Sequence, residues 1–232
     1  MRGNRSMPGT HSQTTRLAVR VLPALLCAAL AAPAGAARLE AVVRDGDGEP
    51  VRDSVVYALA QDASGEPAEP TARTEIDQVD KEFLPYVSAV RVGTRIHFPN
   101  RDQIRHHVYS FSDAKTFEIP LYEGLPAEPI LFDRPGPVVL GCNIHDWMRA
   151  YVFVSETPYF AVTGEDGAAT IEIPAGEYAV EVWHPEQKGE ANATRQRLRV
   201  AAGDAPQLRF SIEHKRVWRP RRAPSLDDPS YR

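Results

Sequence analysis

The sequence predicts an all-β protein built as a β-sandwich, and three features of the chain predict it. Short runs of alternating apolar residues recur along the chain, no stretch keeps an apolar period of 3.6 residues for long, and Gly, Pro and Asp separate the runs. The separating segments are predicted turns, and they include Asp45-Gly46-Asp47-Gly48, Gly164-Glu165-Asp166-Gly167 and Pro174-Ala175-Gly176. Short strands separated by turns of this kind are typical of a sandwich.

Each strand is predicted from the same alternation of apolar and polar residues. An alternating strand places one face on the core and the other toward solvent. In chain order, the predicted strands are 39–44, 54–59, 87–92, 95–98, 107–111, 138–140, 151–154, 169–173, 178–183, 197–200 and 207–212.

The N-terminus has the features of a secretory signal. Arginines without any acidic residue precede the apolar run 21–30, and small residues follow at Ala34-Gly35-Ala36. The run is too short for a transmembrane helix, and no later segment is apolar enough to span a bilayer. The sequence therefore predicts a signal peptide over residues 1–37 and a periplasmic or otherwise exported protein. A lipid anchor on Cys27 is disfavoured because the preceding Leu26 is bulky.

The charge and the cysteine content of the mature chain narrow the function further. Removing residues 1–37 takes away four arginines and no carboxylate, which leaves 27 − 4 = 23 basic residues against 31 acidic ones, a net charge of about −8. A mildly acidic surface argues against nucleic acid as a partner, which would need a basic stripe. Only Cys142 remains, so no internal disulfide can form and the apolar core must hold the fold alone.

Candidate metal ligands gather in two segments, 100–108 and 141–148. In the second, Cys142, His145 and Met148 follow one another at intervals of three residues, and a tight loop between strands can bring all three to one point. A thiolate, an imidazole and a thioether, completed by a distant histidine, suit copper better than zinc, because zinc sites usually use more thiolates or a carboxylate. The distant ligand is one of two adjacent histidines, His106 or His107, whose side chains point to opposite faces of a strand.

These segments resemble the cupredoxins, the blue type-1 copper proteins, and most of all the amicyanin and pseudoazurin branch. Amicyanin copper loops read Cys-x-x-His-x-x-Met, the spacing found here, and the family's Asn, short loop and His entering a strand are matched by Asn100 and His106. The resemblance implies a Greek-key β-sandwich that binds one type-1 copper ion. The ligands that it implies are His106, Cys142, His145 and Met148.

The resemblance covers about residues 74–156 and extends to periplasmic proteins of the methylamine-utilisation or plastocyanin-like type. One departure concerns the residue after the first ligand histidine, which is usually Asn in the family and is His107 here. That Asn normally ties the two copper loops together, so the contacts around the ligands must differ in this chain.

The flanking segments carry a weaker resemblance to carboxypeptidase regulatory-like sandwiches, in a first strand and turn near residue 45 and a closing hairpin near residue 175. Residues 38–62 and 157–213 are expected to form a second, smaller β-sandwich together, with the copper domain, 63–156, inserted between them. Alternatively, 38–62 supplies the first strands of the copper sandwich and 157–213 is an independent module. Residues 214–232 are basic and poor in apolar side chains, which predicts a disordered tail.

The expected function is that of a non-enzymatic, monomeric carrier of single electrons between a redox donor protein and an acceptor protein. A copper-binding or delivery protein is the alternative, but it would need an exposed run of several Met or His residues, and the mature chain keeps only Met148. A structural or carbohydrate-binding sandwich is disfavoured by the complete ligand set. An enzyme is disfavoured because no Ser-His-Asp set, paired carboxylates, phosphate loop or further His cluster appears.

Overall fold

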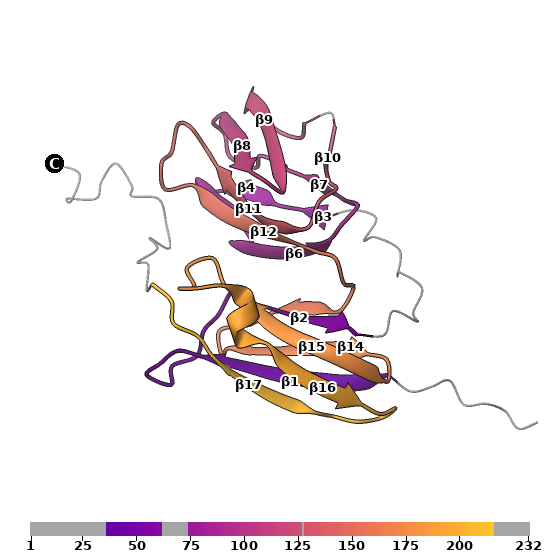
Figure 1. The fold of residues 1–232 in the computed structure, drawn as a ribbon. Helices are drawn as coiled ribbons and strands as arrows, with labels where there is room; N and C mark the ends of the chain where they lie inside the picture. Colours follow the sequence, from indigo (N-terminus) through magenta and orange to yellow (C-terminus); the bar gives the residue numbers. More distant parts are fainter. Residues whose placement is uncertain (1–35, 62–73, 127, 216–232) are drawn as a thin grey trace, which may run out of the picture. The chain divides into compact units, whose positions relative to one another are not determined.

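The protein is all-β, as its sequence predicts. The computed structural model describes residues 36–61, 74–126 and 128–215 (Figure 1). Within these ranges the regular structure consists of strands and one short 3₁₀-helix, η1 (Ala191–Thr194). The predicted signal segment, 1–37, lies outside the described residues up to residue 35, and the predicted tail, 214–232, lies outside them from residue 216.

Strands from the two ends of the chain form one sandwich, here called the flanking sandwich. Its first sheet has the order β14-β1-β17 and its second the order β13-β2-β15-β16. Strands β1 and β2 therefore pair with strands that follow residue 157, as an inserted central segment requires. The bounds are β1 (Ala37–Arg44), β2 (Val55–Ala60), β13 (Phe160–Val162), β14 (Ala168–Ile173), β15 (Gly176–Trp183), β16 (Gln196–Val200) and β17 (Gln207–Ser211).

The core of the flanking sandwich lies between its two sheets, and β1 shows how the sequence specifies it. Leu39, Ala41 and Val43 are buried, while the residues between them are more exposed. Ala37, the last residue of the predicted signal segment, is already buried in this strand and pairs with Ile173. A cut after Ala36 would therefore leave the whole strand in the mature protein.

The strands between residues 74 and 155 form the central sandwich. A five-stranded sheet has the order β6-β12-β11-β8-β9, a three-stranded sheet has the order β10-β7-β3, and β4 and β5 form a hairpin. The chain crosses between the two larger sheets from β7 to β8 and from β9 to β10, as in Greek-key sandwiches. The bounds are β3 (Thr74–Glu75), β4 (Asp77–Val79), β5 (Glu82–Leu84), β6 (Val87–Arg91), β7 (Thr94–His97), β8 (His106–Ser112), β9 (Lys115–Tyr122), β10 (Ile130–Phe132), β11 (Gly136–Gly141) and β12 (Arg149–Ser155).

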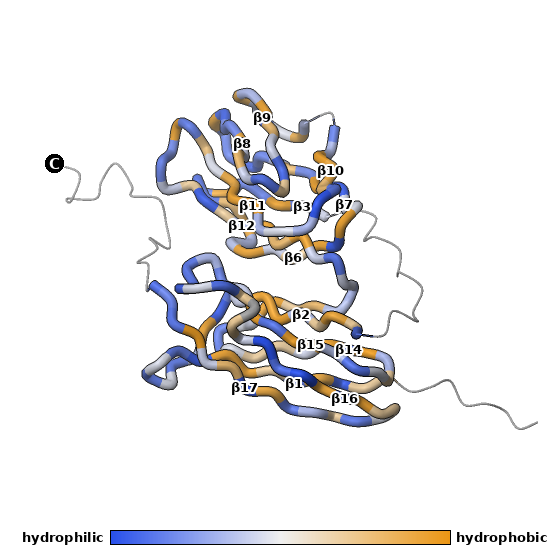
Figure 2. The backbone as a smooth tube through the Cα atoms, in the orientation of Figure 1, coloured by the Kyte–Doolittle hydropathy of each residue, from blue (hydrophilic) through white to orange (hydrophobic). Residues whose placement is uncertain are grey.

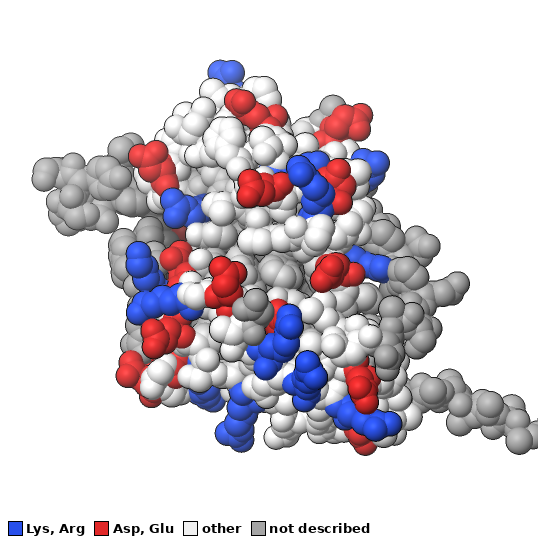
Figure 3. All heavy atoms as spheres, in the orientation of Figure 1, with Lys and Arg blue, Asp and Glu red and all other residues white. Residues whose placement is uncertain are grey.

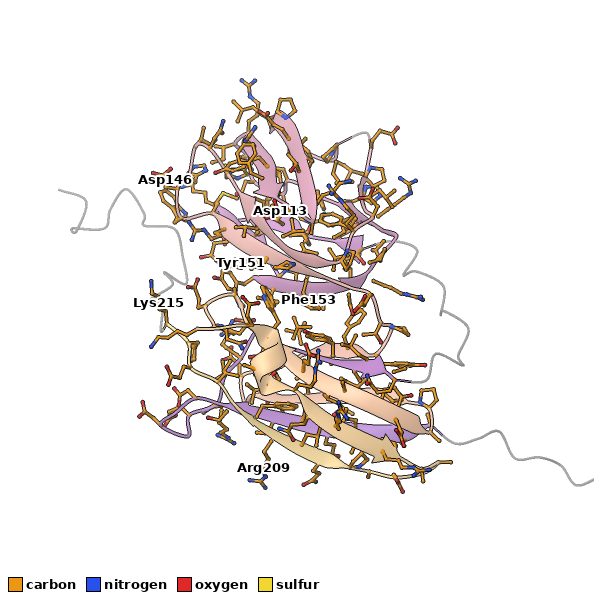
Figure 4. All side chains as sticks on the ribbon, in the orientation of Figure 1. Asp113, Asp146, Tyr151, Phe153, Arg209 and Lys215 are labelled. Atoms are coloured by element: carbon orange, nitrogen blue, oxygen red, sulfur yellow. The ribbon has the colours of Figure 1, made fainter. Side chains whose placement is uncertain are left out.

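Strand β12 is buried on both faces, which explains its continuous run of apolar residues. Val152 and Val154 belong to the core of the central sandwich. Tyr151 and Phe153 project from the other face of the strand (Figure 4) and belong to a cluster that includes Tyr57 of β2, whose ring centroid is 4.9 Å from that of Phe153. Figure 2 shows hydrophobic stretches along β2 and β11, with hydrophilic residues in many connections.

The sequence analysis missed several short strands and one long strand, β9. Pro120 interrupts β9, and proline has no N–H for a sheet ladder. Strand β9 pairs only with β8, at the edge of the five-stranded sheet, where a missing N–H is tolerated. The pairing also shifts between His106 and Val108, the start of the strand that enters the candidate site.

The surface mixes both signs of charge. Basic and acidic side chains are interspersed on the face drawn in Figure 3, and no broad field of one sign covers it. No helix among the described residues has the length and apolarity that a bilayer crossing requires.

Candidate metal centre

The two segments that carry the predicted ligands meet because β8 and β11 are antiparallel neighbours. Gly141 at the end of β11 pairs with Tyr109, so the chain that continues into Cys142 runs past the beginning of β8. His106 is the first residue of β8, and Met148 immediately precedes β12, the other neighbour of β11. Sheet pairing thus brings a histidine from a distant part of the chain to the Cys142–Met148 loop.

Three of the four predicted ligands have their donor atoms close together. One donor atom from each of His106, Cys142 and His145 lies within 4.8 Å of the others, and the described part of the chain holds no second group of three such side chains. Cys142 Sγ is 3.9 Å from His145 Nδ1. The ring centroids of His106 and His145 are 5.1 Å apart. Metal bonds of about 2.0–2.3 Å place two ligand atoms roughly 3.5–4 Å apart across one ion, so this arrangement is close to a binding geometry.

The fourth predicted ligand, Met148, lies in the same buried cluster as Cys142. Their exposed fractions are 2% for Met148 and 3% for Cys142. The backbone N–H of Met148 donates to the carbonyl of His145 at 2.9 Å, which closes the end of the loop into a turn. A compact loop therefore keeps the thioether and the thiol together in the core.

The two ring nitrogens of the fully buried His106 have different surroundings. Nε2 is 2.7 Å from Asp102 Oδ2, whereas Nδ1 is buried and has no hydrogen-bond partner. Leaving a buried polar atom unpaired costs about 1–3 kcal/mol, and a metal ion bound at Nδ1 would remove that cost. Together with a thiol, a second imidazole and a thioether, the unpaired nitrogen fits a copper ion.

The carboxylate of Asp102 holds the loop of His106 to the hairpin β4–β5. Its oxygens accept hydrogen bonds from the backbone N–H groups of Asp80, at 2.7 Å, and Lys81, at 2.9 Å. Asp80 and Lys81 form the turn of the hairpin, with positive φ angles of 53° and 61° that non-glycine residues rarely adopt. Burial raises the pKa of Asp102, but the hydrogen bonds from His106, Lys81 and Asp80 outweigh it, so the pKa lies below its ordinary value.

His145 lies nearer the surface than His106. Its pKa is lowered from the ordinary histidine value by burial and by electrostatic interaction with His106 and Lys81, while Asp102 acts in the opposite direction. The lowered pKa favours the neutral imidazole, the form that has a lone pair available for a metal ion.

Two exposed apolar side chains, Ile144 and Trp147, lie next to His145 in the loop. The ring centroid of Trp147 is 5.1 Å from that of His145. Trp147 is 37% exposed and Ile144 is 48% exposed. Asp146, labelled in Figure 4, lies on the same loop. The candidate site therefore reaches the surface through one imidazole with an indole beside it.

His107 has a different place from His106. Its Nε2 is 2.8 Å from Glu118 Oε1 on β9, and its ring lies beside Tyr109, with centroids 5.4 Å apart. The residue pattern left open which histidine faces the loop, and the structure brings His106 to Cys142 and His145. His107 therefore bonds to the edge strand β9.

Sequence reasoning missed three polar residues around the site: Asp102, Gln78 and Tyr122. The Tyr122 hydroxyl donates to a backbone carbonyl and accepts from the Gln78 amide. Burial raises the pKa of Tyr122 to about 12, with Gln78 acting in the opposite direction and Cys142 adding to the rise. Asp102 carried a usable signal, a carboxylate four residues before a candidate ligand, whereas Gln78 and Tyr122 lie in strands that were not predicted.

Comparison with known proteins found likeness among solved structures. No protein family and no curated protein matches the chain. A Cu-containing nitrite reductase from Thermus scotoductus SA-01 is similar at 26% identity and a TM-score of 0.34, over 42% of this chain and 25% of its own. A purple cupredoxin from Nitrosopumilus maritimus is similar at 22% identity and a TM-score of 0.31, over 36% of this chain and 99% of its own.

A Cu(I) form of a mutant amicyanin is similar at 19% identity and a TM-score of 0.33, over 43% of this chain and 99% of its own. The similarity to the nitrite reductase spans only 25% of that protein's own chain. At TM-scores of this size, the geometry of the site and not the likeness has to support a function.

Proposed function

We propose that the protein is an exported type-1 copper protein that carries single electrons between redox proteins. The observation that supports this best is the assembled donor set of His106, Cys142 and His145, with Met148 in the same buried cluster as the thiol. Two imidazole nitrogens, a thiolate and a thioether make a donor set that suits copper, so these four side chains would hold the ion. A copper ion held by these four side chains would supply the reversible uptake and release of one electron.

The residues around the donors favour fast electron exchange because they are held in place before any metal binds. Asp102 orients the imidazole of His106, and the turn from Met148 to His145 holds the loop. Cys142 is buried in the apolar core, which excludes water from its sulfur. Donors that cannot move far keep the same geometry in both charge states, which lowers the reorganisation on electron transfer.

Electrons would enter and leave through His145. Of the four donors, it is the one that is partly exposed, and Ile144 and Trp147 provide an apolar contact surface around it. Aromatic side chains are favoured at the centres of protein interfaces. We expect the donor and the acceptor to be redox proteins that dock at this edge in turn, with the carrier itself a monomer and no enzymatic step.

The burial of the donors favours electron carriage over copper delivery. His106 is 0% exposed, and Cys142 and Met148 are nearly as deeply buried. A delivery protein has to hand its ion to the ligands of an acceptor, and such a transfer needs several donors within reach of the surface. In this site only His145 is so placed.

We also propose the domain division that the strand pairing supports. The central copper domain, 63–156, is inserted in a second sandwich made of 38–62 and 157–213, because β1 and β2 pair with strands of the later segment. The predicted signal peptide, 1–37, directs the protein to the periplasm, where a single ligand cysteine is compatible with an oxidising environment.

The visible spectrum of the copper-loaded protein tests the function. We expect an intense blue colour from charge transfer out of the Cys142 thiolate, and we expect Cys142→Ser to abolish it while the far-UV circular dichroism stays that of a β protein. Val139→Ser is the matched control, since Val139 is an outward residue of β11 in the same hairpin. A wild-type protein that binds Cu(II) weakly and without colour would refute the proposal.

A further inference from the structure

We infer that Asp102 is a positioning residue of the copper site, which selects the tautomer of His106 and anchors this ligand to the β4–β5 turn. The inference rests on the proposed function, because it takes His106 as a copper ligand. It goes beyond that function by assigning a role to a carboxylate that does not touch the metal.

The geometry around the carboxylate supports this role. Two carboxylate oxygens accept three hydrogen bonds, from His106 Nε2, Asp80 N–H and Lys81 N–H. The backbone of Asp102 is held as well, since its own N–H donates to Asn100 Oδ1 at 3.0 Å. The amide of Asn100 in turn donates to the carbonyls of Ile104 and Tyr122, at 2.8 and 2.9 Å. The carboxylate therefore has little freedom to move away from the imidazole.

The carboxylate also decides which nitrogen of His106 carries the proton. An ionised carboxylate can only accept hydrogen bonds, so the nitrogen that faces it, Nε2, must be the donor. A neutral imidazole with its proton on Nε2 has its lone pair on Nδ1, the buried atom without a partner. Asp102 thus prepares the atom that a copper ion would need.

Replacement of Asp102 by asparagine breaks this arrangement in either orientation of the new amide. Asparagine has one acceptor oxygen and one NH₂ donor. If its NH₂ faces Asp80, two donors meet and the turn loses a hydrogen bond. If its NH₂ faces His106, it meets the Lys81 N–H as well, so the turn again loses a hydrogen bond, and it donates to Nε2, so that the imidazole proton moves to Nδ1, where it would block the metal. The variant therefore separates a positioning role from a passive contact.

The test compares Asp102→Asn with Asp77→Asn in the exported protein. Asp77 lies on β4 of the same hairpin and accepts from Arg101 Nε at 2.7 Å, so its variant removes a nearby charge without touching a histidine. Copper affinity is measured by competition with a chelator. We expect a 10- to 100-fold weaker affinity for Asp102→Asn, the usual effect of losing a partner that orients a ligand, and less than about a twofold change for Asp77→Asn.

Nitrogen NMR of the metal-free protein gives a second readout that needs no copper. We expect the wild-type His106 ring to carry its proton on Nε2. A wild-type ring protonated on Nδ1 would overturn the inference, and so would equal losses of copper affinity in the two variants or an Asp102→Asn affinity within twofold of wild type. A third outcome would separate the two proposals. The wild-type protein would bind no blue copper, while its His106 ring carries the proton on Nε2 and the ring of Asp102→Asn does not. The proposed function would then fail, and the positioning role would stand.

Discussion

Two adjacent histidines allow a sharp test of the site, because only one of them faces the loop of Cys142. His106→Ala removes a side chain whose ring nitrogen lies in one group with the donor atoms of Cys142 and His145. His107→Ala removes a ring that bonds to Glu118, on the other side of the strand. Both are buried imidazoles of β8, so each variant serves as the control for the other.

The two variants are expected to differ in metal binding far more than in stability. Deleting either ring leaves a cavity and removes one hydrogen bond to a carboxylate, so each should cost a few kcal/mol at most. Glu118 is 64% exposed and can be solvated by water, which keeps the cost of His107→Ala toward the low end of that range. His106→Ala removes a proposed ligand and should weaken copper binding more than 100-fold, or by more than about 2.8 kcal/mol. His107→Ala should change copper affinity less than about threefold.

Copper affinity by chelator competition and stability by urea denaturation of the metal-free proteins measure the two effects separately. The electron paramagnetic resonance spectrum of Cu(II) shows in addition whether any copper retained by His106→Ala sits in an altered site. If His107→Ala loses the copper and His106→Ala keeps it, the side-chain assignment of β8 is off by one residue. If both variants keep blue copper, neither histidine is a ligand.

Two further predictions concern the loop. Met148→Leu should raise the reduction potential, because the lost thioether is a weak ligand of the oxidised ion. A rise of about 59 mV would correspond to a tenfold change in the affinity for Cu(I) relative to Cu(II). Voltammetry with metal analysis would detect it. Copper loss to an apo-acceptor from this variant would instead favour a delivery protein. Trp147→Glu should slow electron exchange with a redox partner about tenfold, equivalent to about 1.4 kcal/mol in the encounter complex, with no change in the spectrum. Stopped-flow mixing measures that rate, and an unchanged rate would place docking elsewhere.

The fold class could be predicted from the sequence because strand patterns are local. The alternation in β1 and the continuous apolar run of β12 each reflect the burial of neighbouring residues in one strand. Strand β9 was missed for a physical reason, since Pro120 normally ends a strand and is tolerated here only because the strand lies at a sheet edge. Whether a strand lies at an edge depends on the whole sheet order, which no local pattern contains.

The candidate site also has features that a local pattern predicts and features that depend on strand pairing. Cys142, His145 and Met148 belong to a single short loop, so their spacing alone predicted that they converge; the structure brings the donor atoms of Cys142 and His145 together and buries Met148 in the same cluster as Cys142. The choice between His106 and His107 required the pairing of β8 with β11, because adjacent strand residues differ only in the face to which they point.

The contact between Asp102 and the β4–β5 turn depended on tertiary structure still more. Its partners come from a distant hairpin, and a hydrogen bond between segments far apart in the chain forms only where the fold places donor and acceptor within about 3 Å of each other. The same holds for β1 and β2, whose partners lie more than a hundred residues later in the chain. The sequence alone therefore determined the types of candidate donor and their spacing in the loop, while only the tertiary structure decided which atoms face one another across the site.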